Sequence, residues 1–224
     1  MKIVRLADKD SWIKESSLAI ESFLEKRPET TLALSGGSTP YPVYEYVSLP
    51  PHHQGHLIQV DERCITPSSP DSNQKHILET FPPEKNPQAQ YHMMPVEKGW
   101  KTTVKEYRRT LIGLDSIPRI SILGIGKDGH FASIFPQTEH ILPDFARKDR
   151  VIATTAPDYM PVHERISLTT EYILESDQII ILVGPEKADT LKKIQNPNTS
   201  SYDYPAKILQ DYDNVTVYTY SSID

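Results

Sequence analysis

The chain has 224 residues, of which 38% are hydrophobic and 24% charged, and its formal net charge at pH 7 is −6. These values predict a globular protein with a full core and argue against a general affinity for nucleic acids or membranes. A single cysteine, Cys64, excludes an internal disulfide and a multi-cysteine metal site. The first residues lack the apolar stretch of a signal peptide, so we expect a cytoplasmic protein.

Short β-rich runs alternate with helical patterns along the chain. In chain order we predict a helix over 12–24, a strand at 31–34, a helix opened by Pro40, a strand at 57–60, a helix over 72–79, a weak strand at 91–94, a helix over 98–111, strands at 119–123, 151–154 and 178–183, a helix over 185–194 and a strand at 215–220. The run QIIILV at 178–183 is apolar on both faces, which is typical of a covered parallel sheet. We predict a doubly wound α/β fold with a mainly parallel sheet, helices on both faces and one domain over 1–224.

Six of the nine glycines lie in three loops that directly follow predicted strands. These loops are SGGSTP (35–40), GIGKDGH (124–130) and GPEK (184–187). Ligands of open α/β sheets bind beyond the carboxyl ends of the strands, and glycine lets a ligand approach the backbone closely. We therefore expect the three loops to meet at one ligand site.

The first loop has the composition of an anion cradle, with backbone N–H groups, hydroxyls and a helix start. Taken alone, Ser38 or Thr39 could equally be only the N-cap of that helix. The second loop matches the dinucleotide pattern GxGxxG, but Pro136 interrupts any long helix after it and no acid ends a strand about 20 residues on. Its Asp128 and His130 instead suggest a general base oriented by a carboxylate, although a lone loop histidine is more often a surface residue.

The segment DER closes the second strand with two acids, Asp61 and Glu62, and a basic residue, Arg63. The acids suit acid–base chemistry and Arg63 suits bidentate phosphate binding, while a structural ion pair is the alternative. Three histidines at 52, 53 and 56 have no nearby acid in the sequence, and we predict a solvated loop there rather than a metal site.

Six ordered segments together resemble the 6-phosphogluconolactonase family, whose relatives include glucosamine-6-phosphate deaminase. They span residues 32 to 209 and read LALSGGSTP, VDERCITPSSPDSN, ILGIGKDGHFASIFP, RISLT, VGPEK and YPAKIL. The string DGHFASIFP is the most specific to the lactonase branch. The chain departs from the family pattern at Gln137, where glycine is common, and over residues 156–164.

The resemblance implies hydrolysis of 6-phospho-D-glucono-1,5-lactone in the oxidative pentose phosphate route, without metal or cofactor. By this resemblance His130 is the general base that activates water, with Asp128 beside it. The residues expected to hold the phosphate and the polar groups of the sugar are Gly37, Ser38, Thr39, Arg63, Arg165 and Lys187. The implied partner is a phosphorylated sugar lactone, with no nucleic acid and no membrane.

Two alternatives are a deaminase-like sugar-phosphate isomerase and a non-catalytic sugar-phosphate sensor. The deaminase pattern has a glutamate five residues after the histidine, where this chain has Phe135, and prefers DEY to DER. A DNA-binding sensor requires a helix-turn-helix module, and the segment before residue 31 has room for one helix. Both comparisons favour the lactonase.

Overall fold

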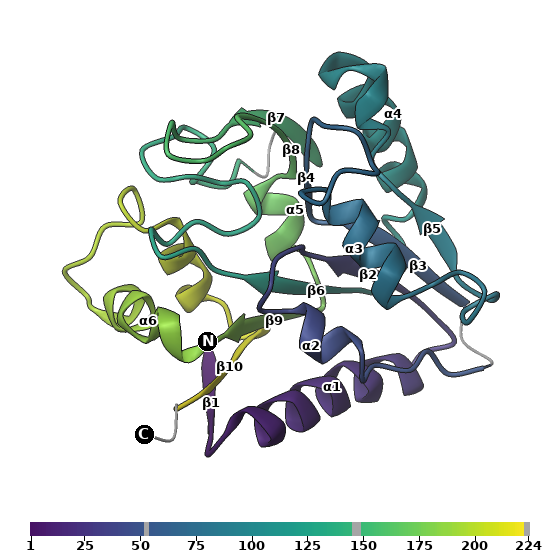
Figure 1. Cartoon of the computed structure of the whole chain (residues 1–224). Coiled ribbons are helices and arrows are strands. Elements are labelled where there is room, and N and C mark those ends of the chain that lie inside the picture. Colours follow the sequence, from purple (N-terminus) through teal and green to yellow (C-terminus); the bar gives the residue numbers. More distant parts are fainter. Residues whose placement is uncertain (52–53, 145–148, 222–224) are drawn as a thin grey trace.

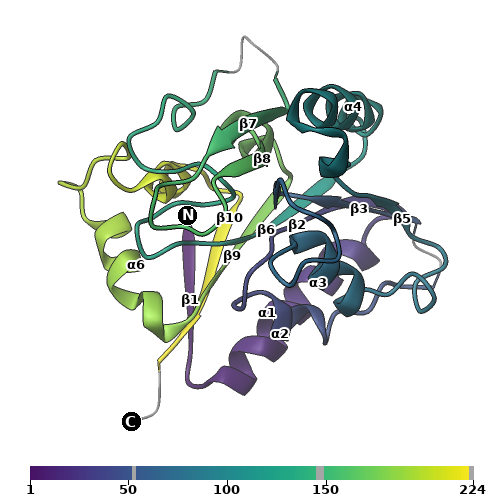
Figure 2. The same cartoon turned by 45° about the horizontal axis from the view of Figure 1, so that its top comes forward.

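A computed structural model describes residues 1–51, 54–144 and 149–221 of the chain (Figures 1 and 2). Its strands are β1 (Lys2–Leu6), β2 (Glu29–Leu34), β3 (Gln54–Gln59), β4 (Asp61–Arg63), β5 (Gln90–His92), β6 (Arg119–Gly124), β7 (Val151–Thr155), β8 (Glu164–Leu168), β9 (Gln178–Val183) and β10 (Val215–Tyr220). Its α-helices are α1 (Lys9–Glu25), α2 (Tyr41–Tyr44), α3 (Asn73–Thr80), α4 (Trp100–Gly113), α5 (Thr170–Leu174) and α6 (Ala188–Gln195). Short 3-10 helices cover Val96–Lys98, Pro185–Lys187 and Pro205–Asp211. None of the helices in the described ranges is long and apolar enough to cross a membrane.

Seven strands form one parallel sheet in the order β1-β10-β9-β6-β2-β3-β5. Chain order and spatial order differ. After β2, strands β3 and β5 extend the sheet on one side of β2, and β6, β9 and β10 then extend it on the other side, toward β1. Strands β6 and β2 are direct neighbours at the centre, and β9 follows β6. This confirms the predicted mainly parallel α/β sheet and places the ends of β2, β6 and β9 side by side.

The large sheet is apolar on both faces because alternate residues of its central strands enter two different cores. On β9, Ile180 and Leu182 pack in the core beneath α1, α2 and α3, while Ile179 and Ile181 pack in the opposite core with α4, α5 and α6. Figure 1 shows α1 and α2 on one side of the sheet and α4 on the other. Helices therefore cover both faces, as the run QIIILV predicts.

A second, three-stranded antiparallel sheet covers part of one face, in the order β4-β8-β7. It is absent from the prediction, which places only the strand at 151–154, and Figure 2 shows β7 and β8 near α4. The prediction also omits β1, a five-residue strand at the edge of the large sheet. Because β4 has only three residues, local pattern carries little information about it.

Two further expectations need correction. The helix opened by Pro40 is a single turn, Tyr41–Tyr44, so it has too few aligned peptides for a strong dipole. His56 lies in β3 and is buried, and its ring contacts Glu29 and His92, so it does not belong to a solvated loop. Residues 52 and 53 lie outside the described residues.

Candidate active site

The three glycine loops meet beyond the carboxyl ends of β2, β6 and β9. The Ser35 hydroxyl accepts a hydrogen bond from the Gly124 amide at 3.2 Å, which ties the first loop to the second. The Lys187 ammonium donates to the Thr39 hydroxyl at 2.9 Å, which ties the third loop to the first. A cavity of about 250 Å³ opens between them. The convergence expected from the order of strands and glycines is therefore present.

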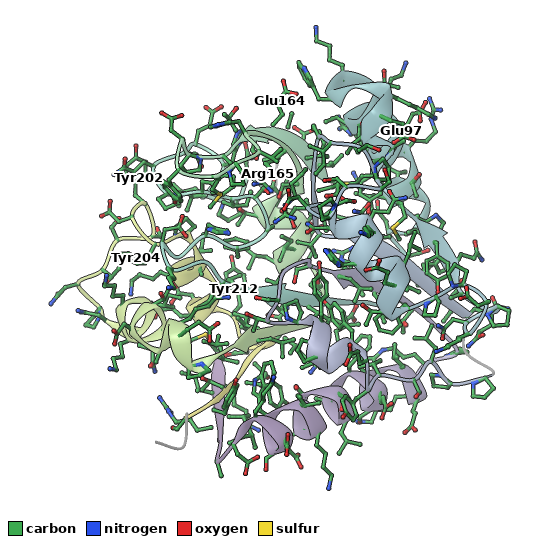
Figure 3. The ribbon with its side chains drawn as sticks, in the orientation of Figure 1. Glu97, Glu164, Arg165, Tyr202, Tyr204 and Tyr212 are labelled. Atoms are coloured by element: carbon green, nitrogen blue, oxygen red, sulfur yellow. The ribbon has the colours of Figure 1, made fainter. Side chains whose placement is uncertain are left out.

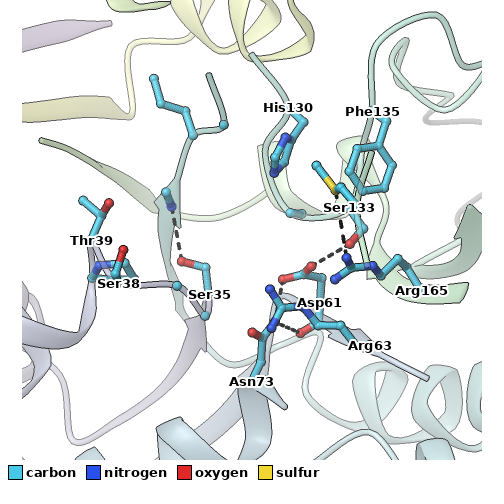
Figure 4. Close-up of a pocket in the computed structure, with 18 of the residues that line it drawn as sticks. Ser35, Ser38, Thr39, Asp61, Arg63, Asn73, His130, Ser133, Phe135 and Arg165 are labelled. Atoms are coloured by element: carbon cyan, nitrogen blue, oxygen red, sulfur yellow. Dashed lines mark hydrogen bonds between the residues drawn. The ribbon is translucent and has the colours of Figure 1, made fainter. Parts of the chain in front are cut away.

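Seven of the eight residues predicted for the site line this cavity: Gly37, Ser38, Thr39, Arg63, His130, Arg165 and Lys187. The eighth, Asp128, is not part of this lining but bonds to the His130 ring. In Figure 4, Ser38 and Thr39 lie on one side of the cavity, Arg63 and Arg165 on the other, and His130 between the two groups. The cavity thus holds an imidazole between two sets of polar and cationic groups.

His130 and Asp128 form a close pair. The distance from His130 Nδ1 to Asp128 Oδ1 is 2.6 Å. Burial acts to raise the pKa of Asp128, but the hydrogen bond and the charge of His130 outweigh it, and the pKa falls to about 2. The carboxylate is therefore ionised at neutral pH and accepts the Nδ1 proton, which leaves Nε2 as the basic nitrogen. Gly126 makes room for the pair, since a Cβ there would lie 2.1 Å from His130 Nδ1.

Arg63 and Arg165 bring two positive charges to the same side of the cavity. They occupy opposed register positions on β4 and β8, where like charges repel. Burial, and then the charge of Arg63, lowers the pKa of Arg165. Both guanidinium groups donate to backbone carbonyls, Arg63 to Asp71 at 2.5 Å and Arg165 to Val162 at 2.9 Å. Because carbonyl groups carry no net charge, these bonds do not neutralise either guanidinium. Arg165 points into the molecule, whereas its strand neighbour Glu164 points outward (Figure 3).

Lys187 supplies a third cation on the side of the first loop. Its ammonium lies 3.9 Å from the Glu186 carboxylate, a long contact for an ion pair. Burial lowers the pKa of Lys187, because a charged amine loses solvation inside the cavity wall. An anion bound in the cavity beside the Lys187 ammonium would restore that lost stabilisation. This acidic protein therefore brings three cationic side chains, Arg63, Arg165 and Lys187, to one cavity.

The two acids of DER have different environments. Glu62 is fully buried and accepts hydrogen bonds from the backbone amides of Arg63, Asn73 and Gln74, so its role is to hold the chain around β4 and α3. Asp61 lines the cavity instead, and its Oδ2 accepts the Ser133 hydroxyl at 2.6 Å. Glu62 therefore has a structural role through hydrogen bonds rather than through the ion pair considered from the sequence, whereas Asp61 faces the cavity.

Three residues that line the cavity, Asn73, Ser133 and Met160, were not singled out from the sequence, and Phe135 was considered only for the comparison with the deaminase. Asn73 donates to Asp61, while its own Oδ1 is buried and has no hydrogen-bond partner among the described residues. Such an acceptor at the cavity wall suits a sugar hydroxyl. Ser133, Phe135 and Met160 also line the cavity, and the Phe135 ring lies 5.1 Å from the His130 ring. Asn73 and Ser133 belong to the segments SPDSN and HFAS, which were used for the resemblance but not as individual residues.

Known proteins share the sequence pattern of this chain. The family described as glucosamine-6-phosphate isomerases/6-phosphogluconolactonase matches residues 9–218. The 6-phosphogluconolactonase of Thermotoga maritima is 31% identical over 193 residues, which cover 83% of this chain and 83% of that protein. The 6-phosphogluconolactonase of a Synechocystis species is 30% identical over 203 residues, which cover 85% of this chain and 82% of the relative.

Solved structures share the fold. A crystal structure of 6-phosphogluconolactonase from Thermotoga maritima has a TM-score of 0.79 at 26% identity and covers 99% of both chains. A monomeric glucosamine-6-phosphate deaminase has a TM-score of 0.78 at 19% identity, covering 99% of this chain and 98% of that one. Because proteins named for two different reactions share this fold, the side chains of the cavity must distinguish the reactions.

Proposed function

The chain belongs to the family of glucosamine-6-phosphate isomerases and 6-phosphogluconolactonases, and from this premise we propose that it hydrolyses 6-phospho-D-glucono-1,5-lactone to 6-phosphogluconate. The observation that carries the proposal is the His130–Asp128 pair, whose imidazole lines one cavity with three cationic side chains and lies beside the apolar ring of Phe135. This arrangement has a base and an anion site.

The proposed reaction begins when His130 Nε2 removes a proton from a water molecule as its oxygen attacks C1 of the lactone. Negative charge develops on the carbonyl oxygen, and the bond from C1 to the ring oxygen then breaks. The imidazolium returns its proton to that ring oxygen, and the new acid group ionises in solvent. Asp128 stabilises the imidazolium between these two proton transfers, since its carboxylate accepts the Nδ1 proton throughout.

The cationic residues supply binding and electrostatic stabilisation in this proposal. Lys187 and the loop that contains Gly37, Ser38 and Thr39 hold the phosphate. Arg63 and Arg165 add positive charge for the phosphate and for the oxyanion that develops during attack. A lactone is an activated acyl group, so a base, an anion site and an electrostatic field suffice for hydrolysis.

Phe135 separates the lactonase from the isomerase alternative. Its ring packs against His130 at the position where the deaminase pattern has a glutamate, and phenylalanine has no proton to transfer. We expect the protein to accelerate acid release from freshly generated 6-phosphogluconolactone above the spontaneous rate. With glucosamine 6-phosphate it should release no ammonia. Ammonia release without lactone hydrolysis would reverse the assignment.

Lys187→Ala should weaken substrate binding while the fold is kept. A charge-assisted contact to phosphate contributes roughly 1.5–3 kcal/mol, which corresponds to a loss of about 10- to 150-fold in kcat/KM. The matched control is Lys192→Ala on α6, whose ammonium pairs with Asp189 at the exposed surface. Steady-state kinetics on both variants test the prediction, and equal values of kcat/KM in the two would refute the role of Lys187.

The proposal also covers the domain organisation and the cellular location of the protein. We assign residues 1–224 to one lactonase domain with one site, an assignment supported by the family match over residues 9–218. We also place the enzyme in the cytoplasm, because a chain with a single cysteine needs no oxidising compartment to fold.

A further inference from the structure

The Asp128 carboxylate has a second partner besides His130. Its Oδ1 accepts hydrogen bonds from His130 Nδ1 at 2.6 Å and from the His130 amide at 3.3 Å. Its Oδ2 accepts the Tyr159 hydroxyl at 2.5 Å. Both oxygens are therefore engaged, one by the imidazole and one by the phenol. We propose that Tyr159 is a positioning residue, which holds the Asp128 carboxylate in the orientation in which it accepts the Nδ1 proton of His130.

Tyr159 reaches Asp128 from the loop that joins β7 to β8. A backbone hydrogen bond from the Ala156 N–H to the His163 carbonyl, at 2.8 Å, joins the two ends of this loop. Within the loop, the Met160 N–H donates to the Pro157 carbonyl at 2.9 Å and forms a turn. Met160 lies in the cavity wall beside Tyr159 in sequence. The loop is thus attached to the site and lies within the segment that departs from the family pattern. The geometry assigns that segment a role in the site.

The Tyr159 side chain contributes little to the packing of the fold. The residue is 68% exposed, so it contributes little to either core. Although most of the residue is exposed, loss of solvent around its hydroxyl and the hydrogen bond to Asp128 raise the pKa of that hydroxyl to about 12, so the phenol stays protonated and donates at neutral pH. Asp128, with a pKa near 2, stays ionised and accepts. Proton positions along Tyr159, Asp128 and His130 are therefore fixed, with Nε2 of the imidazole free to accept.

This inference rests on the proposed lactonase function, and Tyr159→Phe tests it because the ring stays and only the hydroxyl is lost. We expect kcat to fall by about 3- to 10-fold with little change in KM. Loss of the donor concentrates negative charge next to the imidazole, which favours its protonated, inactive form. The acid limb of the kcat profile should therefore move to higher pH by roughly half a unit. The other charged groups lining the cavity with His130, which are Asp61, Arg63, Arg165 and Lys187, are the same in both proteins.

Tyr202→Phe is the matched control. Tyr202 is also exposed, and its hydroxyl donates to the Gln137 carbonyl at 3.3 Å rather than to Asp128 or His130 (Figure 3 shows Tyr202 on the loop after α6). This variant should keep the wild-type kcat and pH profile. In an Asp128→Asn background, Tyr159→Phe should cause no further loss, because the carboxylate through which it acts is gone. A Tyr159→Phe variant with wild-type kcat and acid limb, or one whose loss persists in Asp128→Asn, would overturn the proposal.

The protonation state of the His130 ring can be measured without turnover. Two-bond ¹H–¹⁵N NMR spectra of the His130 ring should show the Nδ1–H tautomer in the wild type and, at the same pH, a larger fraction of imidazolium in Tyr159→Phe. If the wild type fails to hydrolyse the lactone, the proposed function is wrong, and this spectrum still decides whether Tyr159 positions the pair. An identical spectrum in the two proteins would refute the positioning role whatever the activity.

Discussion

His130→Asn should lower kcat for lactone hydrolysis by about 10²–10⁴-fold, the usual contribution of a positioned general base. Asparagine has a similar polar outline but cannot take a proton from water at neutral pH. The proposed phosphate-binding groups come from other elements, Lys187 after β9 and Thr39 after β2, so binding of 6-phosphogluconate should be kept. Single-turnover kinetics give the chemical step, and calorimetric titration with the product gives the binding.

The pH dependence identifies the group responsible. Because Asp128 has a pKa of about 2, it stays ionised throughout the assay range and cannot cause an acid limb near neutrality. An imidazole base is inactive once it is protonated, so wild-type kcat should fall as the pH is lowered. Spontaneous hydrolysis must be subtracted at each pH, and the melting temperature must show an intact fold. The control is His76→Asn on α3, outside the cavity lining. Near-wild-type turnover in His130→Asn would move the search for the base to Asp61.

The large sheet and the position of the site were predictable because their signals are local. The run QIIILV at 178–183 corresponds in full to β9, since residues facing both cores must be apolar. The glycine loops follow strands that are neighbours in the sheet, so a rule about strand ends was enough to bring Ser38, His130 and Lys187 together.

The second sheet was not predictable from local pattern. Residues of β4 pair with residues of β8 that lie about a hundred positions later, and no period in either short segment reveals this pairing. The opposition of Arg63 and Arg165 depends on that register, so the sequence indicated two phosphate-binding residues without showing that they share one side of the cavity. Resemblance to the family placed Arg165 in the site, whereas spacing alone did not.

The departures from the family pattern have distinct physical explanations. Gln137 has a φ of 61°, in the left-handed region that glycine occupies at low cost. Its backbone N–H donates to the Tyr202 carbonyl at 2.8 Å. A glutamine thus adopts here a backbone conformation that glycine reaches at lower cost. The segment 156–164 differs in another way, because it supplies side chains, Met160 to the cavity wall and Tyr159 to Asp128. Only the three-dimensional contact of Tyr159 with Asp128 reveals that role.

Glu62→Gln should lower the free energy of unfolding by about 2–4 kcal/mol. Both carboxylate oxygens accept hydrogen bonds: Oε1 from the amides of Arg63 and Asn73, and Oε2 from Gln59, Ser72 and the Gln74 amide. Glutamine must replace one oxygen with an NH₂ group, which then faces donors in either orientation. Buried donors left without acceptors cost roughly 1–3 kcal/mol each, although rearrangement recovers part of this.

Urea unfolding measures the loss, and an unchanged m value shows that the same surface is exposed in both proteins. The control is Glu79→Gln on α3, an exposed glutamate with ion-pair contacts to Lys75 and His76, which should change stability by less than about 0.5 kcal/mol. Because Glu62 anchors the backbone of Arg63 but does not line the cavity, kcat per folded molecule should change far less in Glu62→Gln than in His130→Asn. A stable Glu62→Gln protein that has lost its chemical step would instead make Glu62 part of the catalytic machinery, and the buried contacts would not account for it.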